Sequence, residues 1–470
     1  MLSLVQTSRR FGRREFLRIG GLALGGLSLA DLVAARAAES TASISPLRGR
    51  LVKDRSVVFL FLHGGPSQFE TFDPKMSAPA EVRSATDEVT TRIPGVTFGG
   101  TFGRLASLAD KLTVVRSFTT GDANHDIKPI VCRDTLGANM GSLYSRVAGP
   151  NHPATGVPTN AALYPQAVVP ESMPAIKSFG NFESTGTLGG SAAPFVPGSG
   201  GQMQQAMQLS IPMGRLDDRR HLLREFDRVR MGLDARGSLA GLDATREQAF
   251  RMILGGVAGA FDLKREDPHV VARYDTAPLV RPEAISRQWN NYKHYTDNSQ
   301  TLGKLLLLAR RLCEAGCGFV TVTTSFVWDM HADVNNAGMV EGMGYMGLPL
   351  DHAVSAFVED VEARGLSDRI LLVVCGEMGR TPRINAKGGR DHWGNLAPLL
   401  LYGGGLRMGQ VIGQSTRDGG APLSEPITIK HLLATVMQSL LDVGQVRVAN
   451  GLPTDLVQAL TGGMPIPGLL

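Results

Sequence analysis

The chain has 470 residues, of which 48 are lysine or arginine and 43 are aspartate or glutamate, giving a formal charge of +5. Six of the arginines and only two of the acids fall within residues 1–38, so the rest of the chain is nearly neutral. A nearly neutral chain gives no sign of the basic surface that binds nucleic acid, and we expect no nucleic-acid partner. Hydrophobic residues make up 43% of the chain, enough for the core of a large α/β domain.

The first forty residues contain the three parts of an export signal in order. A positively charged part is followed by an apolar, glycine-rich run from Ile19 to about Ala30 and by the A-x-A sequence Ala35-Arg36-Ala37. The charged part contains Arg13-Arg14-Glu15-Phe16-Leu17-Arg18, which resembles the twin-arginine motif that the Tat translocase reads. We therefore expect a twin-arginine signal peptide at residues 1–38, a linker at residues 39–55, and export by the Tat pathway to the periplasm or the extracellular space.

Retention of this signal as an uncleaved membrane anchor remains an alternative. No apolar run after residue 40 reaches the roughly 20 residues that a transmembrane helix needs, so we expect no such helix in the mature chain. The Tat pathway carries folded proteins, which is compatible with a metal ion inserted before export.

Apolar runs of strand length alternate with helical patterns along the remaining chain. We expect buried strands at residues 56–62, 111–117, 318–323, 369–375 and 396–402, and helices at residues 301–314 and 351–364. Residues 148–215 are rich in glycine, proline, alanine and serine and are expected to form loops or an insertion, with helical periodicity over residues 215–262. The alternation predicts a three-layer α/β fold, a mostly parallel sheet with helices on both faces, in one domain over residues 56–470.

Polar residues gather at the ends of the predicted strands, where ligands bind in open α/β sheets. The groups are His63, Ser67, Glu70 and Asp73; His125 and Asp126; Trp328-Asp-Met-His331 and Asp333; Gly376-Glu-Met-Gly-Arg-Thr-Pro382; and Gly389-Arg-Asp-His-Trp393. Burying so many charges without a purpose would cost free energy. Their convergence on one face therefore indicates a functional site.

Taken singly, these groups leave alternatives open. Asp329 and His331 are two residues apart, so in extended backbone they point to the same side and could hold a transition metal, or they could be a helix cap and a surface histidine. Glu377 could form a simple ion pair within its turn. Asp391 could belong to a salt-bridged turn, or it could orient His392 as the partner of a metal-bound imidazole.

Longer motifs resemble those of a bacterial family known as domain of unknown function 1501, over nearly the whole chain. They are His63-Gly-Gly-Pro-Ser-Gln-Phe-Glu-Thr-Phe-Asp-Pro-Lys75, Trp328-Asp-Met-His331, Gly376-Glu-Met-Gly-Arg-Thr-Pro-Arg-Ile-Asn385 and Gly389-Arg-Asp-His-Trp393. That family resembles a branch of the alkaline phosphatase and sulfatase superfamily. The resemblance implies an alkaline-phosphatase-like fold and metal-assisted attack on phosphate or sulfate esters by a serine, threonine or formylglycine nucleophile.

The resemblance also implies a set of metal ligands. Asp329, His331 and His392 correspond to one superfamily metal site, with His63 and Glu377 as weaker candidates for a second site. The second site looks eroded, because His63 stands where the superfamily has an aspartate and Met378 is a poor ligand for such cations. The expected cofactor is a divalent metal ion, and zinc, manganese and calcium are not distinguished.

The catalytic residues implied by the resemblance are less defined. Glu377 would be a ligand or general base, and Arg380 and Arg390 would pair with anionic substrate oxygens. Candidate nucleophiles follow the second strand, and none of them stands out: Thr119, Thr120 and His125, with Ser67 as an outside alternative.

Two functions therefore remain in view. The first is an exported metal-dependent hydrolase of a phosphate or sulfate ester, either a small anionic ester or a sulfated or phosphorylated polymer. The second is a non-catalytic exported protein on the same fold that binds an anionic ligand or a partner. The residues favour the hydrolase, because erosion of one metal site still leaves the other with its ligands.

Overall fold

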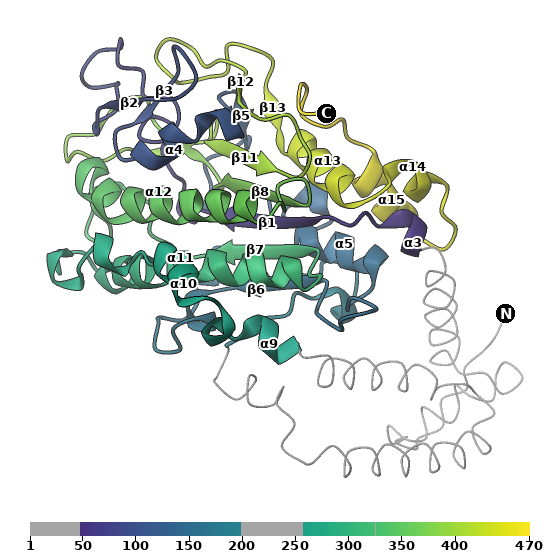
Figure 1. The fold of residues 1–470 in the computed structure, drawn as a ribbon. Coiled ribbons are helices and arrows are strands. Elements are labelled where there is room, and N and C mark those ends of the chain that lie inside the picture. The colour runs from purple at the N-terminus through teal and green to yellow at the C-terminus, as the bar shows by residue number, and fades with distance from the viewer. Residues whose placement is uncertain (1–47, 199–256, 325) are drawn as a thin grey trace, which may run out of the picture. The chain divides into compact units, whose positions relative to one another are not determined.

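The computed structural model describes residues 48–198, 257–324 and 326–470, which belong to one unit of the chain (Figure 1). The expected signal peptide, most of the expected linker and most of the predicted helical stretch after residue 215 lie outside the described residues. Within them, no helix has the length and apolarity needed to cross a membrane.

A seven-stranded sheet forms the middle layer, in the order β12-β4-β11-β8-β1-β7-β6. Its strands are β1 (Ser56–Phe61), β4 (Leu112–Val115), β6 (Asn160–Leu163), β7 (Phe319–Thr323), β8 (Ile370–Cys375), β11 (Leu399–Gly403) and β12 (Gln410–Ile412). Only β11 runs antiparallel to its neighbours, and the other six strands share one direction. The prediction of a mostly parallel sheet is confirmed.

The central strands are buried on both faces, which explains their continuous apolar sequences. Val57 of β1 pairs with Phe319 of β7 on one side and with Leu371 of β8 on the other. Every residue of these three strands is buried. Their positions agree with the predictions at residues 56–62, 318–323 and 369–375.

Helices cover both faces of the sheet, which confirms the three-layer prediction (Figure 1). The long helices α11 (Tyr292–Glu314) and α12 (Met339–Ala363) pack together and share one hydrophobic core with alternate strand residues such as Val58 and Leu60. Helices α5 (Met140–Ala148) and α13 (Ile429–Leu440) also contact the sheet but contribute no residue to that core, since they lie on the opposite face.

Short elements complete the described part of the chain. The remaining α-helices in the described ranges are α3 (Arg48–Leu51), α4 (Gly103–Ser107), α9 (Val257–Phe261), α10 (Pro268–Arg273), α14 (Val443–Val448) and α15 (Thr454–Thr461). Three two-stranded pairs join β2 (Glu88–Thr90) to β3 (Thr97–Gly99), β5 (Phe118–Thr119) to β13 (Ile427–Thr428), and β9 (Gly379–Arg380) to β10 (His392–Trp393).

Some elements differ from expectation. Strand β6 lies inside the segment expected to be loops or an insertion, yet it forms an edge of the central sheet beside β7. Its sequence, Asn-Ala-Ala-Leu, has no β-branched or aromatic residue that would signal a strand. Helix α12 begins at Met339, well before the predicted start at residue 351. The prediction began too late because Pro349 and three glycines obscure the helical pattern in the first half of the helix. Helix α3 lies within the expected linker.

An ion-pair network fixes α11 against the segment before α10. Arg310, which is 1% exposed, lies 2.7 Å from the Glu266 carboxylate, and Arg311 and Arg364 lie 2.8 and 3.1 Å from it. Burial raises the pKa of Glu266, but the hydrogen bonds from Arg311 and Arg310 outweigh burial and lower the pKa to about 2. The ionised carboxylate therefore stabilises the folded chain.

Replacing Glu266 with glutamine should lower the free energy of unfolding by about 3 kcal/mol at pH 7, because the buried Arg310 loses a partner. The folded pKa of about 2 lies below the ordinary 4.5, so this stabilisation is present above about pH 4.5 and is lost as the pH falls toward 2. Urea unfolding across this range should show the variant and the wild type converging.

The matched control is Glu359→Gln, which breaks an ion pair with Arg273 whose two side chains are each 46% exposed. An exposed pair contributes about 0.5 kcal/mol or less. Equal losses from the two variants would contradict the stabilising role of the network.

Candidate metal centre

Three loops meet at the carboxyl ends of the parallel strands and bring four side chains together. Asp329 and His331 lie on the loop after β7, and His125 lies on the loop after β5. His392 begins β10, in the segment between β8 and β11. Because β11 is antiparallel, its first residue pairs with the last residue of β8. The segment between the two strands therefore lies at the carboxyl ends of the parallel strands.

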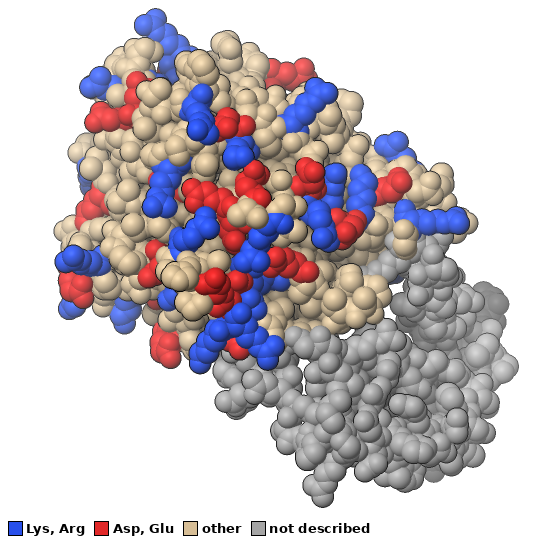
Figure 2. Space-filling view, viewed as in Figure 1, with Lys and Arg blue, Asp and Glu red and all other residues tan. Residues whose placement is uncertain are grey.

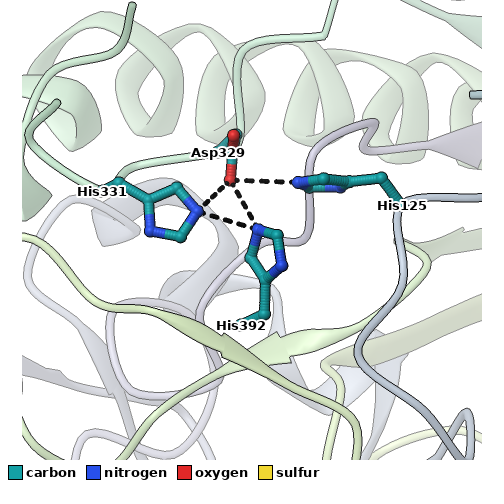
Figure 3. Close-up of side chains that lie close together, drawn as sticks. All are labelled: His125, Asp329, His331 and His392. Atoms are coloured by element: carbon teal, nitrogen blue, oxygen red, sulfur yellow. Dashed lines mark hydrogen bonds and ion pairs between the residues drawn. The ribbon is translucent and has the colours of Figure 1, made fainter. Parts of the chain in front are cut away.

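The four side chains point toward a common centre (Figure 3). One ligand atom from each, three imidazole nitrogens and a carboxylate oxygen, lies within 4.8 Å of the others. Asp329 Oδ1 is 2.8 Å from His331 Nε2, 3.2 Å from His392 Nε2 and 3.4 Å from His125 Nε2. The Nε2 atoms of His331 and His392 are 2.8 Å apart. The expected trio of Asp329, His331 and His392 is thus brought together.

Two of the imidazole rings contact a carboxylate through Nδ1, the ring nitrogen that faces away from the centre. His125 Nδ1 lies 3.1 Å from Glu377 Oε1, and His331 Nδ1 lies 3.2 Å from Asp391 Oδ1. A carboxylate only accepts, so each Nδ1 carries a proton, which leaves Nε2 of each ring as the atom that could bind a metal ion at the centre. This carboxylate–imidazole arrangement is typical of metal-binding histidines.

The chemistry of the donor set fits a metal ion. The Nε2 atoms of His331 and His392, 2.8 Å apart, and the oxygen of Asp329 lie so close together that a cation between them, or a proton on a ring nitrogen, is needed to offset the repulsion of their lone pairs. One metal ion held by Asp329, His331 and His392 would relieve this repulsion. Imidazole nitrogens together with a carboxylate oxygen suit zinc or manganese, whereas calcium takes six to eight oxygen ligands.

The carboxyl group of Asp329 is ionised in this setting. Burial raises its pKa, but the neighbouring rings of His125, His331 and His392 and the charge of Arg380 outweigh burial and hold the pKa well below its ordinary value. Burial lowers the pKa of His125, yet its two carboxylate neighbours outweigh burial and raise that pKa. Protons and a metal ion therefore compete for this cluster.

Asp391 supports a different histidine from the one expected. It contacts His331 rather than its chain neighbour His392. Successive side chains in extended backbone point to opposite sides, so Asp391 and His392, at the start of β10, cannot face each other. Asn385 links the same parts, since its side-chain amide donates to the carbonyl of His331 at 3.0 Å and to Asp391 at 3.3 Å.

Arg380 is beside the cluster but is not free to bind substrate as expected. Its guanidinium is fully buried and lies 2.6 Å from Asp329 Oδ1. Each of its nitrogens already has a partner, among them the carbonyls of Gly65 at 2.7 Å and Arg390 at 3.2 Å. Arg380 therefore positions Asp329 and contributes its charge, and a direct contact with substrate oxygens does not fit this geometry.

The guanidinium of Arg390 is likewise held by contacts within the protein. Its fully buried guanidinium lies 2.9 Å from Glu70, donates to the carbonyls of Val82 and Arg83 at 3.0 Å, and stacks 4.3 Å from the ring centre of Phe69. The expected contact with substrate oxygens does not fit here either. The pair holds the segment before His392 against the loop after β1.

The expected nucleophiles lie around the cluster rather than in it. Ser67 donates to Glu70, and Thr119 donates to the carbonyl of Gly394 at 3.2 Å, so both hydroxyls have structural partners. Thr120 is 6% exposed, and its hydroxyl has no hydrogen-bond partner among the described residues. Within the described residues, none of these three hydroxyls forms a hydrogen bond with Asp329. Only His125 reaches the cluster.

His63 and Glu377, the weaker ligand candidates, are buried beside the cluster. Glu377 is fully buried and accepts from the backbone N–H of Gly64 at 2.9 Å as well as from His125. His63 is 2% exposed, and its ring lies 4.9 Å from that of Phe326. Neither belongs to the cluster of four. Burial lowers the pKa of His63, which favours the neutral ring.

Glycines allow the turn after β1 to approach the centre closely. Gly64 and Gly65 have φ of +118° and +84°, in the region that favours glycine. A Cβ atom on Gly64 would lie 2.6 Å from the backbone nitrogen of Asp329. Nearby, Gln68 fixes Arg380 by bonding both its N–H and its carbonyl, a role that the sequence analysis missed.

A family model described as protein of unknown function (DUF1501) matches residues 54–466. The chain belongs to the DUF1501 family. The family expected from the motifs is confirmed, and in this DUF1501 protein those motifs supply three of the four cluster residues, Asp329, His331 and His392, and buried residues behind them.

Comparison with the curated proteins found no match. Among solved structures, the PsFucS1 sulfatase from Pseudoalteromonas sp. aligns at 12% identity and a TM-score of 0.34, over 86% of this chain and 71% of the other. The lipoteichoic acid synthase LtaP from Listeria monocytogenes aligns at 8% and 0.33, over 90% and 79%. The phosphonate monoester hydrolase SpPMH from Silicibacter pomeroyi aligns at 10% and 0.32, over 88% and 78%. At these scores the likeness carries no argument, and the site is interpreted from its own geometry.

Replacing His392 with alanine should abolish stoichiometric metal binding, because it removes one of the converging nitrogens. Elemental analysis of the wild type should find about one equivalent of zinc or manganese per chain, with affinity falling at lower pH as protons compete. His269→Ala, at an exposed histidine, is the matched control. Full metal content in folded His392→Ala protein would contradict the assignment.

Replacing Asp391 with asparagine should weaken metal binding without removing a ligand. The loss of the carboxylate behind His331 should lower metal affinity about 10- to 100-fold. Competition with a chelator measures this change. Asp54→Asn, at an exposed aspartate paired with Arg369, should leave the affinity unchanged. Equal affinities for both variants would show that Asp391 does not orient His331.

Proposed function

We propose that this protein is an exported, metal-dependent hydrolase of phosphate or sulfate esters. The observation that carries the proposal is the convergence of Asp329, His331 and His392 at the carboxyl edge of the sheet. Residues on loops at this edge bind and transform ligands in many α/β proteins.

The exposure of the ligands supports a catalytic rather than a structural centre. The side chains of His331 and His392 are 21% and 29% exposed, so a molecule from outside can approach the centre. Asp329, at 11%, lies deeper. Structural metal sites are closed by four protein ligands, whereas catalytic sites keep one position open.

The charge of the site supports an anionic substrate. The carboxylate of Asp329 and the guanidinium of Arg380 cancel each other at 2.6 Å. A divalent cation held here would therefore offset the two further carboxylates behind the rings, Glu377 and Asp391, so that the site does not repel an anion, and it would supply a Lewis acid that polarises a phosphoryl or sulfuryl oxygen. The residues of the chain hold and orient this centre, and Arg380 keeps Asp329 ionised and in place.

The substrate class follows from this chemistry and from the motifs that resemble the alkaline phosphatase and sulfatase superfamily. Small anionic esters and sulfated or phosphorylated polymers both present the tetrahedral oxyanion that such a centre binds. We include export in the proposal because of the twin-arginine motif at Arg13-Arg14, with the Tat translocase as the partner during export.

A panel of p-nitrophenyl phosphate, bis(p-nitrophenyl) phosphate and p-nitrophenyl sulfate tests the proposal. Protein stripped with a chelator and reloaded with zinc or manganese should hydrolyse at least one ester at a rate that tracks its metal content. Asp329→Asn should lower this rate by at least about 100-fold.

Asp333→Asn is the matched control on the same loop. The Asp333 carboxylate caps the backbone N–H groups of Asn335 and Asn336 at 2.8 Å and does not belong to the cluster. Its rate should stay near that of the wild type. A folded protein that binds metal but hydrolyses no ester would favour the alternative, a non-catalytic protein that binds an anionic ligand.

A further inference from the structure

The cluster contains one ligand too many for a catalytic centre. Four protein ligands complete a tetrahedral zinc site, and a catalytic zinc site keeps one position free for water or substrate. If the proposed hydrolase function is correct, one of the four side chains in Figure 3 has a different role. The geometry distinguishes one of them, His125.

His125 is the least engaged member of the cluster. Its Nε2 lies 3.4 Å from Asp329 Oδ1, farther than the corresponding atoms of His331 and His392. Those two rings also contact each other, whereas His125 Nε2 is buried and has no hydrogen-bond partner. A buried polar atom without a partner indicates that a partner is absent or that the atom takes part in a reaction.

The other side of the ring is firmly held. His125 Nδ1 donates to Glu377 at 3.1 Å, and Glu377 is itself fixed by the N–H of Gly64 at 2.9 Å. Phe326 packs edge-on against the ring, with centres 4.6 Å apart, and Phe179 lies 5.2 Å away. The ring is therefore fixed in orientation with its Nε2 atom directed at the centre.

We propose that His125 Nε2 is the nucleophile that accepts a phosphoryl group from the substrate, with Glu377 as its positioning residue. This inference rests on the proposed function and narrows its substrate class to phosphate esters. A nucleophile backed by a hydrogen-bonded carboxylate follows the general logic of activated nucleophiles. Ser67 and Thr119 are engaged elsewhere, which leaves the hydroxyl of Thr120 as the competing nucleophile.

The reaction balances in two steps. The lone pair of Nε2 forms an N–P bond while the P–O bond to the leaving alcohol breaks, and the departing oxygen takes a proton from water. The imidazole ring becomes positively charged, and the carboxylate of Glu377 stabilises that charge through Nδ1–H. Water then attacks phosphorus, the N–P bond breaks, phosphate leaves with the proton lost to solvent, and neutral His125 is restored. No redox partner is needed.

The test uses the full-length, metal-loaded protein and 32P-labelled p-nitrophenyl phosphate in a rapid quench. We expect a burst of p-nitrophenol and a labelled protein whose label is stable in alkali, is lost in acid, and maps to His125. Those stabilities are the chemical signature of an N–P bond and not of a serine or threonine ester.

His125→Gln separates the nucleophile from a metal ligand. We expect it to keep about one equivalent of metal and the unfolding midpoint of the wild type, and to lose the label and at least about 100-fold in turnover. His125→Gly with added imidazole should regain part of the turnover. Glu377→Gln should slow labelling about 10-fold or more while the label still maps to His125.

Each contrary result has a distinct meaning. Loss of metal from folded His125→Gln protein would make His125 a ligand and overturn the inference. Label on Thr120, or metal-dependent turnover without a burst or a label, would also overturn it while the proposed function stands. Wild-type protein that binds metal but neither hydrolyses nor is labelled by any ester of the panel would overturn the proposed function itself.

Discussion

The buried carboxylate of Asp329 is the interaction on which the rest of the site depends. A carboxylate this deep costs free energy unless cations and donors surround it. Arg380 supplies the fixed positive charge at 2.6 Å, and the three imidazoles face the same oxygen. Arg380 is in turn held by backbone carbonyls of the turn after β1, which approaches this closely because Gly64 and Gly65 have no side chain. The motifs of the family are thus parts of one electrostatic assembly around a single oxygen.

The topology of the sheet explains why residues so far apart in sequence meet there. The parallel strands β1, β7 and β8 have their carboxyl ends on the same side of the sheet, so the loops that follow them lie together there. The antiparallel strand β11 begins at the same side of the sheet, so the segment with Arg390 and His392, which precedes it, lies beside the other loops. The Arg390–Glu70 ion pair, buried on both sides, then connects the loop before β11 to the loop after β1.

Much of this arrangement could be predicted from the sequence, and the remainder depends on tertiary contacts. Continuous apolar runs identified β1, β7 and β8, and the two-residue spacing of Asp329 and His331 indicated that both point to one side. The hydrogen-bond partners of Arg380 and Arg390 could not be inferred, because a sequence does not show whether a guanidinium contacts solvent or buried carbonyl groups. The partner of His125, a carboxylate 252 positions away, was equally out of reach. Strand β6 was missed because its residues have weak strand propensity.

The measurement that tests the central claim most directly is a crystal structure with anomalous scattering recorded at the absorption edge of the bound metal. We expect one anomalous peak at about 2.0–2.2 Å from Asp329 Oδ1 and from the Nε2 atoms of His331 and His392. His125 Nε2 should lie beyond bonding distance of that peak. A peak elsewhere, or none in protein supplied with zinc or manganese, would contradict the account of a metal centre built on Asp329.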